Sequence, residues 1–170
     1  MTTTLADVLL VLLSDGPRTV QDLHQRHRDT LGPARQVDIT RVVSTMTRLE
    51  RLGHIRPDAA RSRAQYRVWT VTDAGHRSWR AWILDVRAGA AQEDIVVRAL
   101  LALAATDRPT YETVIAACTA CLETRRHHPR RRRPLSAPDA LDDLDDAVAA
   151  TALRWLRRLR TRPRARARVT

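Results

Sequence analysis

The sequence has no phenylalanine and only two cysteines and five glycines among its 170 residues. Two cysteines are too few for the disulfide framework that stabilises small secreted domains. The apolar run at residues 8–13 is too short for a membrane span, and no positively charged leader or small-residue cleavage pattern accompanies it. We therefore expect a soluble, cytoplasmic protein without a membrane partner.

Sequence motifs of common catalytic sites are also missing. The chain has no glycine-rich phosphate loop, no GxSxG or HExxH motif, and no paired carboxylates at catalytic spacing. Cys118 and Cys121 form a CxxC pair within a helical pattern, without the second pair that a structural zinc site needs. We predict no enzyme activity, no cofactor and no metal, with a metal or thiol sensor at these cysteines as a minority alternative.

The formal net charge of +11 points to an anionic partner, and its distribution along the chain matters. Every basic residue is arginine, which reflects codon bias as much as function. Residues 125–133 carry six arginines and residues 154–168 carry eight, without one acidic residue in either run. Residues 1–92 are basic independently of these runs, with fourteen arginines against nine acidic residues.

Residues 38–53 have the strongest functional pattern in the chain. Apolar residues recur there at helical spacing, at Ile39, Val42, Met46 and Leu49, while arginine, serine and threonine occupy the opposite face. Short hydroxyl side chains allow close approach of a helix to another surface, and arginine suits guanine edges and phosphates. Such a face is most often only solvated, so its meaning depends on its neighbours.

The neighbouring segments predict a winged helix-turn-helix domain in residues 1–88. Helices are expected at residues 4–13, from a cap at Thr19 to Gly32, and from a cap at Asp38 to Gly53. Strands at residues 54–58 and 65–72 flank a basic loop, which makes a wing of two or three strands. A fourth helix begins at residue 72 or 73 and is expected to end near Gly89.

Residues 89–160 predict a helical dimerisation and effector region, so the fold class is mainly α with a small wing. Helices are expected at 93–105, 110–126 and 139–159, with a linker at 127–138 and a disordered basic tail at 161–170. The last helix has an apolar stripe that needs a partner, which favours a homodimer. The stripe comprises Leu141, Leu144, Val148, Ala152, Trp155 and Leu159.

Short motifs in the same order and at the same spacing make the chain resemble the PadR family of winged-helix transcriptional regulators. They are LVLLSDGPRTVQDL at 10–23, TRLERLGHI at 47–55, QYRVWTVTDAG at 65–75, HRSWRAWI at 76–83, VVRALLALAATDRPTYETVIAACTACLE at 96–123 and ALRWLRRL at 152–159. The chain departs from the family pattern at residues 20–21 and 43–44. The resemblance implies a homodimeric transcriptional repressor that binds an operator. It also implies that the DNA affinity falls when a small aromatic or polycyclic effector binds between the carboxy-terminal helices and the winged domain.

The candidate site residues follow from both lines of reasoning. We expect groove contacts from one set of residues: Thr40, Arg41, Ser44 and Arg48. We expect phosphate or wing contacts from a second set: Arg51, Arg61, Arg63 and Arg67. Trp155 is similar in position to a ligand-packing aromatic residue of the family, and Trp79 and Trp82 are further ligand candidates, although helical tryptophans usually pack in a core or dimer interface. A MarR-like or penicillinase-repressor-like regulator and a nonspecific arginine-rich nucleic-acid-binding protein remain alternatives.

Overall fold

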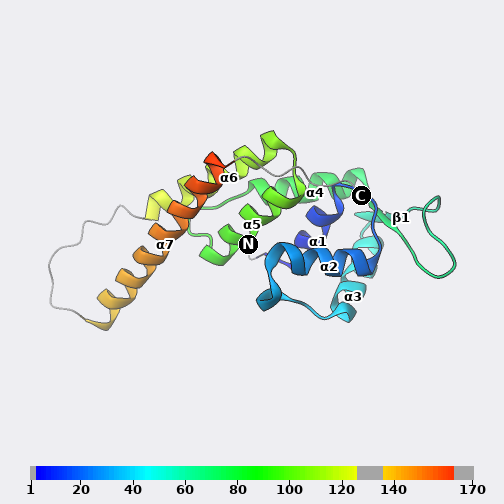
Figure 1. Cartoon of the computed structure of the whole chain (residues 1–170), viewed down its shortest axis with the longest axis horizontal. Helices are drawn as coiled ribbons and strands as arrows, with labels where there is room; N and C mark the ends of the chain where they lie inside the picture. The colour runs from blue at the N-terminus through cyan, green and yellow to red at the C-terminus, as the bar shows by residue number, and fades with distance from the viewer. Residues whose placement is uncertain (1–2, 126–135, 163–170) are drawn as a thin grey trace.

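The computed structural model describes residues 3–125 and 136–162 as a mainly helical fold with a two-stranded wing (Figure 1). The expected tail and most of the expected linker lie outside these residues. In chain order the elements are α1 (Leu5–Leu13), α2 (Val20–Leu31), the short 3-10 helix η1 (Pro33–Arg35), α3 (Ile39–Arg51), β1 (Ile55–Pro57), β2 (Trp69–Val71), α4 (Asp73–Leu84), α5 (Gln92–Ala105), α6 (Arg108–Arg125) and α7 (Ala137–Thr161).

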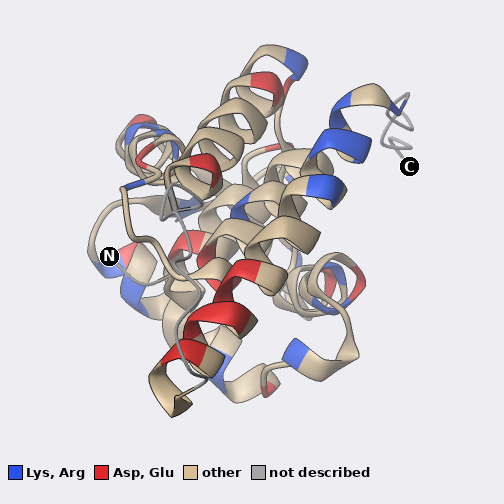
Figure 2. Cartoon of the chain, turned by 90° about the vertical axis from the view of Figure 1, so that its left-hand side faces the viewer, with Lys and Arg blue, Asp and Glu red and all other residues tan. Residues whose placement is uncertain are grey.

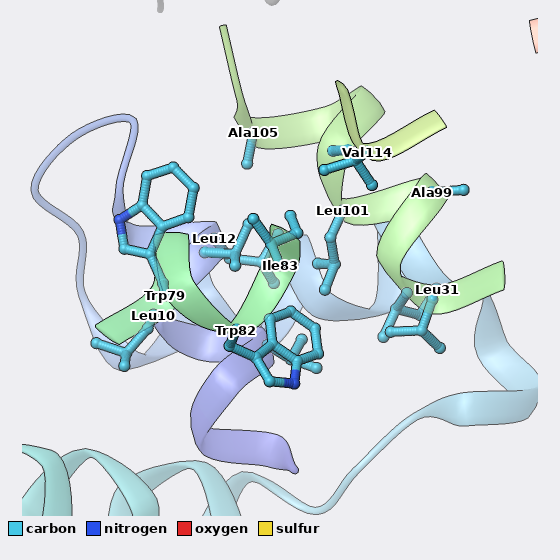
Figure 3. Packing of buried hydrophobic residues seen from close by; sticks show 14 of the residues in the cluster. Leu10, Leu12, Leu31, Trp79, Trp82, Ile83, Ala99, Leu101, Ala105 and Val114 are labelled. Atoms are coloured by element: carbon cyan, nitrogen blue, oxygen red, sulfur yellow. The ribbon is translucent and has the colours of Figure 1, made fainter. Parts of the chain in front are cut away.

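Helix α1 lies at the centre of the fold because nearly all of its side chains are apolar. It packs against α2, α3, α4 and α5, and every residue from Val8 to Leu13 is buried. One continuous cluster of buried side chains extends from α1 through α4 and α5 to α6 (Figure 3), and it continues onto α7. The loop between α4 and α5 contains the expected domain boundary at residues 88–89, and the core continues across it.

The predicted helix starts are confirmed by their caps. Thr19 and Asp22 form a capping box at the start of α2, and Asp38 accepts a hydrogen bond from the Thr40 amide at the start of α3. Gly53 has a φ of +71° and ends α3 with two hydrogen bonds, from its own amide to Glu50 and from the His54 amide to Leu49. These bonds satisfy carbonyls that the helix would otherwise leave unpaired.

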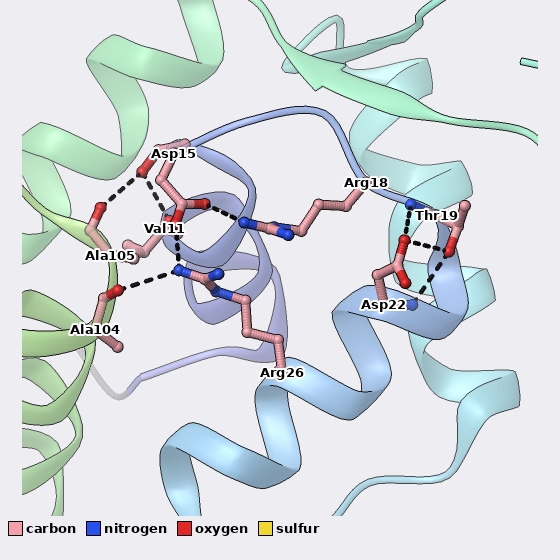
Figure 4. A network of polar contacts seen from close by, with 9 residues as sticks. Val11, Asp15, Arg18, Thr19, Asp22, Arg26, Ala104 and Ala105 are labelled. Carbon is pink, nitrogen blue, oxygen red and sulfur yellow. Dashed lines mark hydrogen bonds and ion pairs between the residues drawn. The ribbon is translucent and has the colours of Figure 1, made fainter. Parts of the chain in front are cut away.

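A cluster of polar contacts joins the loop between α1 and α2, together with α2 itself, to the carboxy-terminal end of α5 (Figure 4). Asp15 pairs with Arg18 and Arg26, and Arg26 also donates to the carbonyl oxygen of Ala104 at 3.1 Å. Ser14 donates to the carbonyl of Ala105. The last carbonyls of α5 are thereby held by residues of the helix-turn-helix.

Four expectations about the elements are wrong in detail. Helix α4 ends at Leu84 instead of near Gly89, because Asp85 has a non-helical ψ of 68° and its amide bonds back to Ala81 and Trp82. Ile39 is 38% exposed, because the first turn of α3 extends beyond the core. The second strand pairs only over Trp69–Val71, because the preceding residues form the tip of the hairpin.

The fourth wrong expectation concerns the stripe on α7. The buried residues of α7 are Ala149, Ala152, Leu153 and Leu156, and only Ala152 among them belongs to the predicted stripe. Leu141, Leu144 and Val148 are instead 63%, 57% and 39% exposed. Only the second half of α7 is therefore buried by the chain itself. No helix in the described part of the chain combines the length and apolarity needed to cross a membrane.

Candidate nucleic-acid interface

Helix α3 presents one face to the core and one to solvent, as its sequence predicts. Val42, Met46 and Leu49 are at most 2% exposed and contact the core beneath α1 and α2. The opposite face holds every α3 residue predicted to contact DNA, and all of them are exposed: Thr40, Arg41, Ser44, Arg48 and Arg51. The structure thus brings these five together on one surface.

The hydroxyl groups on this face are satisfied within the helix. Thr40 Oγ1 donates to Asp38 at 2.6 Å, and Ser44 Oγ donates to the carbonyl oxygen of Arg41 at 3.0 Å. The Thr40 side chain and amide lower the pKa of the Asp38 carboxyl, since both hydrogen bonds favour its charged form. Because these donors are already used, Thr40 and Ser44 have only acceptor positions left for a ligand.

The arginines of α3 have no such commitment. Arg41, Arg48 and Arg51 make no side-chain hydrogen bond or ion pair with other described residues, and all three are exposed. Their guanidinium groups keep all of their donors available for an anionic or hydrogen-bonding partner.

The wing continues from this surface through an antiparallel hairpin. Its strands pair Ile55 with Val71 and Pro57 with Trp69, and an isolated bridge joins Trp69 to Arg18 in the turn before α2. Because buried Val71 and Trp69 anchor the strands, the basic loop projects outwards (Figure 1). The loop itself is exposed on nearly all of its residues between 59 and 67.

The three predicted wing arginines have local partners, unlike those of α3. Arg61 pairs with Asp58 at 3.4 Å, and Arg63 donates to the carbonyls of Ala60 and Ser62. Arg67 lies 3.7 Å from a Glu50 carboxylate oxygen and 5.1 Å from the Trp69 ring centroid. Exposed pairs of this kind stabilise a fold by less than about 1 kcal/mol, so a stronger anion can replace them.

The sequence reasoning missed three residues on the same surface. Val43 is 48% exposed on α3, Tyr66 is 45% exposed at the tip of the wing, and Arg56 is exposed on β1 without a partner among the described residues. Val43 was detectable because it falls outside the apolar stripe. Its methyl groups suit a thymine methyl in a major groove.

The end of α3 is fixed in place by α4 through an unusually close approach. A Cβ on Gly75 would lie 2.1 Å from the His54 carbonyl oxygen and 2.7 Å from Val71 Cγ1, so only glycine fits there. Thr72 strengthens the contact, because its hydroxyl donates to the Gly53 carbonyl at 2.6 Å. Residues 72–75, TDAG, therefore hold the end of the predicted reading helix in close contact with the start of α4 and with the wing.

The tryptophans proposed for ligand binding occupy different positions. Trp79 and Trp82 are 4% and 7% exposed on α4 and belong to the core, where Trp79 donates to His76 (Figure 3). Trp155 is half-buried on α7. Among the described residues, the single aromatic ring contact joins His76 and Trp79, so no ring stacks on Trp155.

The cysteine pair is packed in the core. Cys118 is fully buried and Cys121 is 6% exposed, and their thiols point to the carbonyls of Ile95 and Arg87. Burial raises the pKa of the Cys118 thiol to about 12, which keeps it protonated and weakly reactive at neutral pH. No cluster of three metal-ligating side chains occurs within residues 3–125 and 136–162.

No protein-family model and no curated protein matches the chain. Its fold is similar to that of PadR from Bacillus subtilis, solved in complex with operator DNA, with 13% identity and a TM-score of 0.44 over 92% of this chain and 97% of that one. It is also similar to a PadR-like transcriptional regulator from Bacillus cereus, with 18% identity and a TM-score of 0.40 over 90% of this chain and 93% of that one.

Proposed function

We propose that the chain is a sequence-specific DNA-binding transcriptional regulator of PadR type, acting as a homodimeric repressor. The observation that carries this proposal is the outward face of α3, where Arg41, Arg48 and Arg51 have no partner among the described residues. An exposed helix with free arginines, firmly seated beside a basic hairpin, has the geometry with which winged helix-turn-helix proteins read a major groove. Thr40 and Ser44 let the helix approach the base edges closely.

The two sets of arginines have different roles in this proposal. Arg41 and Arg48, at the exposed side of α3, read bases, whereas Arg51, Arg61, Arg63 and Arg67 neutralise phosphates. Phosphate contacts set affinity and its salt dependence, and base contacts set the choice of sequence. The local partners of Arg61 and Arg63 are weak enough for phosphates to displace them.

The exposed stripe of α7 supports the homodimer. Leu141, Leu144 and Val148 are exposed and lie on the same side of α7 as half-buried Trp155, which follows Val148 by seven residues. The first half of α7 is acidic and its end is rich in arginine (Figure 2). Two antiparallel copies of α7 would bury both stripes and place acidic turns against basic ones, which is a self-complementary arrangement.

An effector that lowers DNA affinity is the last part of the proposal. It rests on the family resemblance and on Trp155, the half-buried indole at the edge of the α7 stripe. Trp79 and Trp82 are core residues and could join such a site only if α4 moved.

Selection of a duplex from a random DNA library, followed by fluorescence anisotropy, tests the DNA part. The selected duplex should bind more tightly than a scrambled one. Arg41→Ala should reduce the preference by about 1 to 3 kcal/mol, whereas Arg63→Ala should weaken binding to both duplexes alike and reduce the salt slope by about one. Arg108→Ala, which removes an exposed arginine from α6, is the matched control.

Equal affinity of the parent protein for the selected and scrambled duplexes would refute sequence-specific binding. It would favour the nonspecific alternative, in which the arginine runs at residues 125–133 and 154–168 supply the affinity. Deletion of residues 163–170 separates the two, since a nonspecific protein loses nearly all binding and a regulator only part.

The oligomeric state tests the dimer. Leu144→Arg should convert a dimer into a monomer in sedimentation velocity experiments, because it places a charge within the apolar stripe. Asp142→Ala on the opposite side of the same turn of α7 is the control and should weaken the dimer far less. A monomeric parent protein would contradict this part of the proposal.

A further inference from the structure

Helix α3 has an exposed apolar side as well as its exposed arginines. Val43 is 48% exposed and Ile39 is 38% exposed, and neither belongs to the buried core. The two residues are four positions apart, so their side chains lie on the same side of the helix in successive turns. We call these two β-branched side chains the methyl patch. A single exposed apolar side chain needs no explanation, so the surroundings of the patch decide its role.

The methyl patch lies between the arginines of α3 and the wing. With 3.6 residues per turn, Arg41 and Arg48 are separated from Val43 by more than about a third of a turn around the helix axis. Glu50 follows Val43 by seven residues, about two turns, so it lies on the same side of α3, and its carboxylate is 3.7 Å from Arg67 of the wing. The Val43 side of α3 therefore faces the wing. A duplex that contacts both the arginines and the wing passes over the methyl patch.

The polar groups next to Val43 leave it as an apolar contact. The Thr47 hydroxyl donates to the Val43 carbonyl oxygen at 3.1 Å, and the Ser44 hydroxyl donates to the Arg41 carbonyl oxygen at 3.0 Å. Neither hydroxyl has a proton left to donate to a base. Residues 39–49 contain no acidic side chain, so nothing in this stretch repels a phosphate backbone. At this point α3 therefore offers a duplex methyl groups instead of further hydrogen-bond donors.

We propose that Val43 is a specificity-determining residue that contacts the C5-methyl group of a thymine in the operator, with Ile39 extending the contact. Among the groups that base pairs display in a major groove, the thymine methyl is apolar and the others are hydrogen-bond donors or acceptors. A methyl group held against Val43 leaves water, which favours thymine over a base that lacks this group. The inference rests on the proposed function, because it requires α3 in a major groove, and it names a base that this face selects.

Replacement of thymine by deoxyuridine tests this contact, because it removes the C5-methyl group and keeps the hydrogen-bonding groups of the base. The full chain is titrated with the duplex that it selects, and each thymine of that duplex is replaced in turn. Fluorescence anisotropy should show that at least one replacement weakens binding about fourfold, as the loss of one buried methyl group predicts. The same replacement should leave the affinity of Val43→Ala almost unchanged, since the side chain that contacts the methyl group is gone.

Leu84→Ala is the matched control variant. Leu84 is an apolar residue at the end of α4 and is 42% exposed, similar to Val43. Its removal should leave the discrimination between thymine and deoxyuridine unchanged. Ile39→Ala should reduce the discrimination without abolishing it, because Val43 remains. All three substitutions place a good helix former at an exposed helix position, so the variants should fold, which circular dichroism checks.

Two results would overturn the contact and leave the proposed function intact. The first is a selected duplex in which no single replacement weakens binding. The second is a loss of affinity on replacement that persists in Val43→Ala, which would mean that another residue or the shape of the duplex senses the methyl group. Equal affinity of the parent chain for its selected and scrambled duplexes would instead refute sequence-specific binding and, with it, this contact.

Discussion

Helices α3 and α7 are both amphipathic and both carry several arginines, but the rest of the chain buries them to different extents. Helix α3 buries its apolar stripe over Val42, Met46 and Leu49 and exposes a polar, basic face. Helix α7 buries only its second half, leaving Leu141 and Leu144 more than half exposed. What each helix exposes indicates its expected partner, which is an anionic surface for α3 and an apolar one for α7.

The largest expected effect compares the same substitution in the two helices. Leu49→Ala in α3 should lower the free energy of unfolding by about 3 kcal/mol, since it opens a cavity at a residue that is 2% exposed. Leu144→Ala in α7 should change it by less than about 0.5 kcal/mol in the monomer. Urea denaturation at low protein concentration measures both. Equal losses would mean that α7 is as fully packed as α3.

A second substitution disturbs the packing of α4 against the end of α3 without changing a residue of α3. Gly75→Ala should destabilise the protein by about 2 kcal/mol, because its Cβ would collide with the His54 carbonyl that follows α3. Arg77→Ala, an exposed change on the same helix, is the control. Thermal unfolding followed by circular dichroism reports the difference, and equal melting temperatures for the two variants would refute the close contact.

The caps of the two helices give a smaller and more selective effect. Asp38→Ala should lower global stability by about 1 kcal/mol, because it removes the cap of a helix that belongs to the core. Ser136→Ala removes the cap of α7, where residues 140–145 are exposed, so it should fray those turns with little global effect. Amide hydrogen exchange distinguishes local fraying from global loss, and faster exchange confined to α3 in Asp38→Ala would contradict the expectation.

The smallest effect concerns pH and the region that supports α3. Burial lowers the pKa of His27 on α2, with a further contribution from His24, so the folded state favours the neutral ring. The unfolded chain takes up the proton more readily, so this stability is present above pH 6.5 and is lost as the pH falls below it. In denaturation curves between pH 7.5 and 5, His27→Leu should show a weaker dependence than the parent. An unchanged slope would exclude His27 as its source.

Much of the helix-turn-helix was predictable because its signals are local. Thr19 with Asp22, Asp38 and Gly53 each fix a helix end through atoms within a few residues, so their positions in the sequence suffice. The candidate reading face was equally accessible, since periodicity alone separates Arg41 and Arg48 from Val42 and Met46. The sequence did not predict that the Thr40 and Ser44 hydroxyl groups form hydrogen bonds within the helix, because several acceptors compete for a hydroxyl.

The errors about burial, at Ile39 and along α7, occurred where a partner distant in the sequence decides the outcome. The stripe on α7 looked continuous, but α6 packs on Leu153 and Leu156 and leaves Leu141 to solvent. The burial of Arg98 also depends on tertiary structure, since an arginine within an apolar helix gives no sign that the Trp82 ring centroid lies 4.2 Å from its guanidinium carbon. The sequence by itself determined which segments are helical, most of their ends and which faces carry charge, because backbone capping and periodicity are local. Only the tertiary structure decided which of those faces is buried, because burial depends on contacts between residues far apart in the chain.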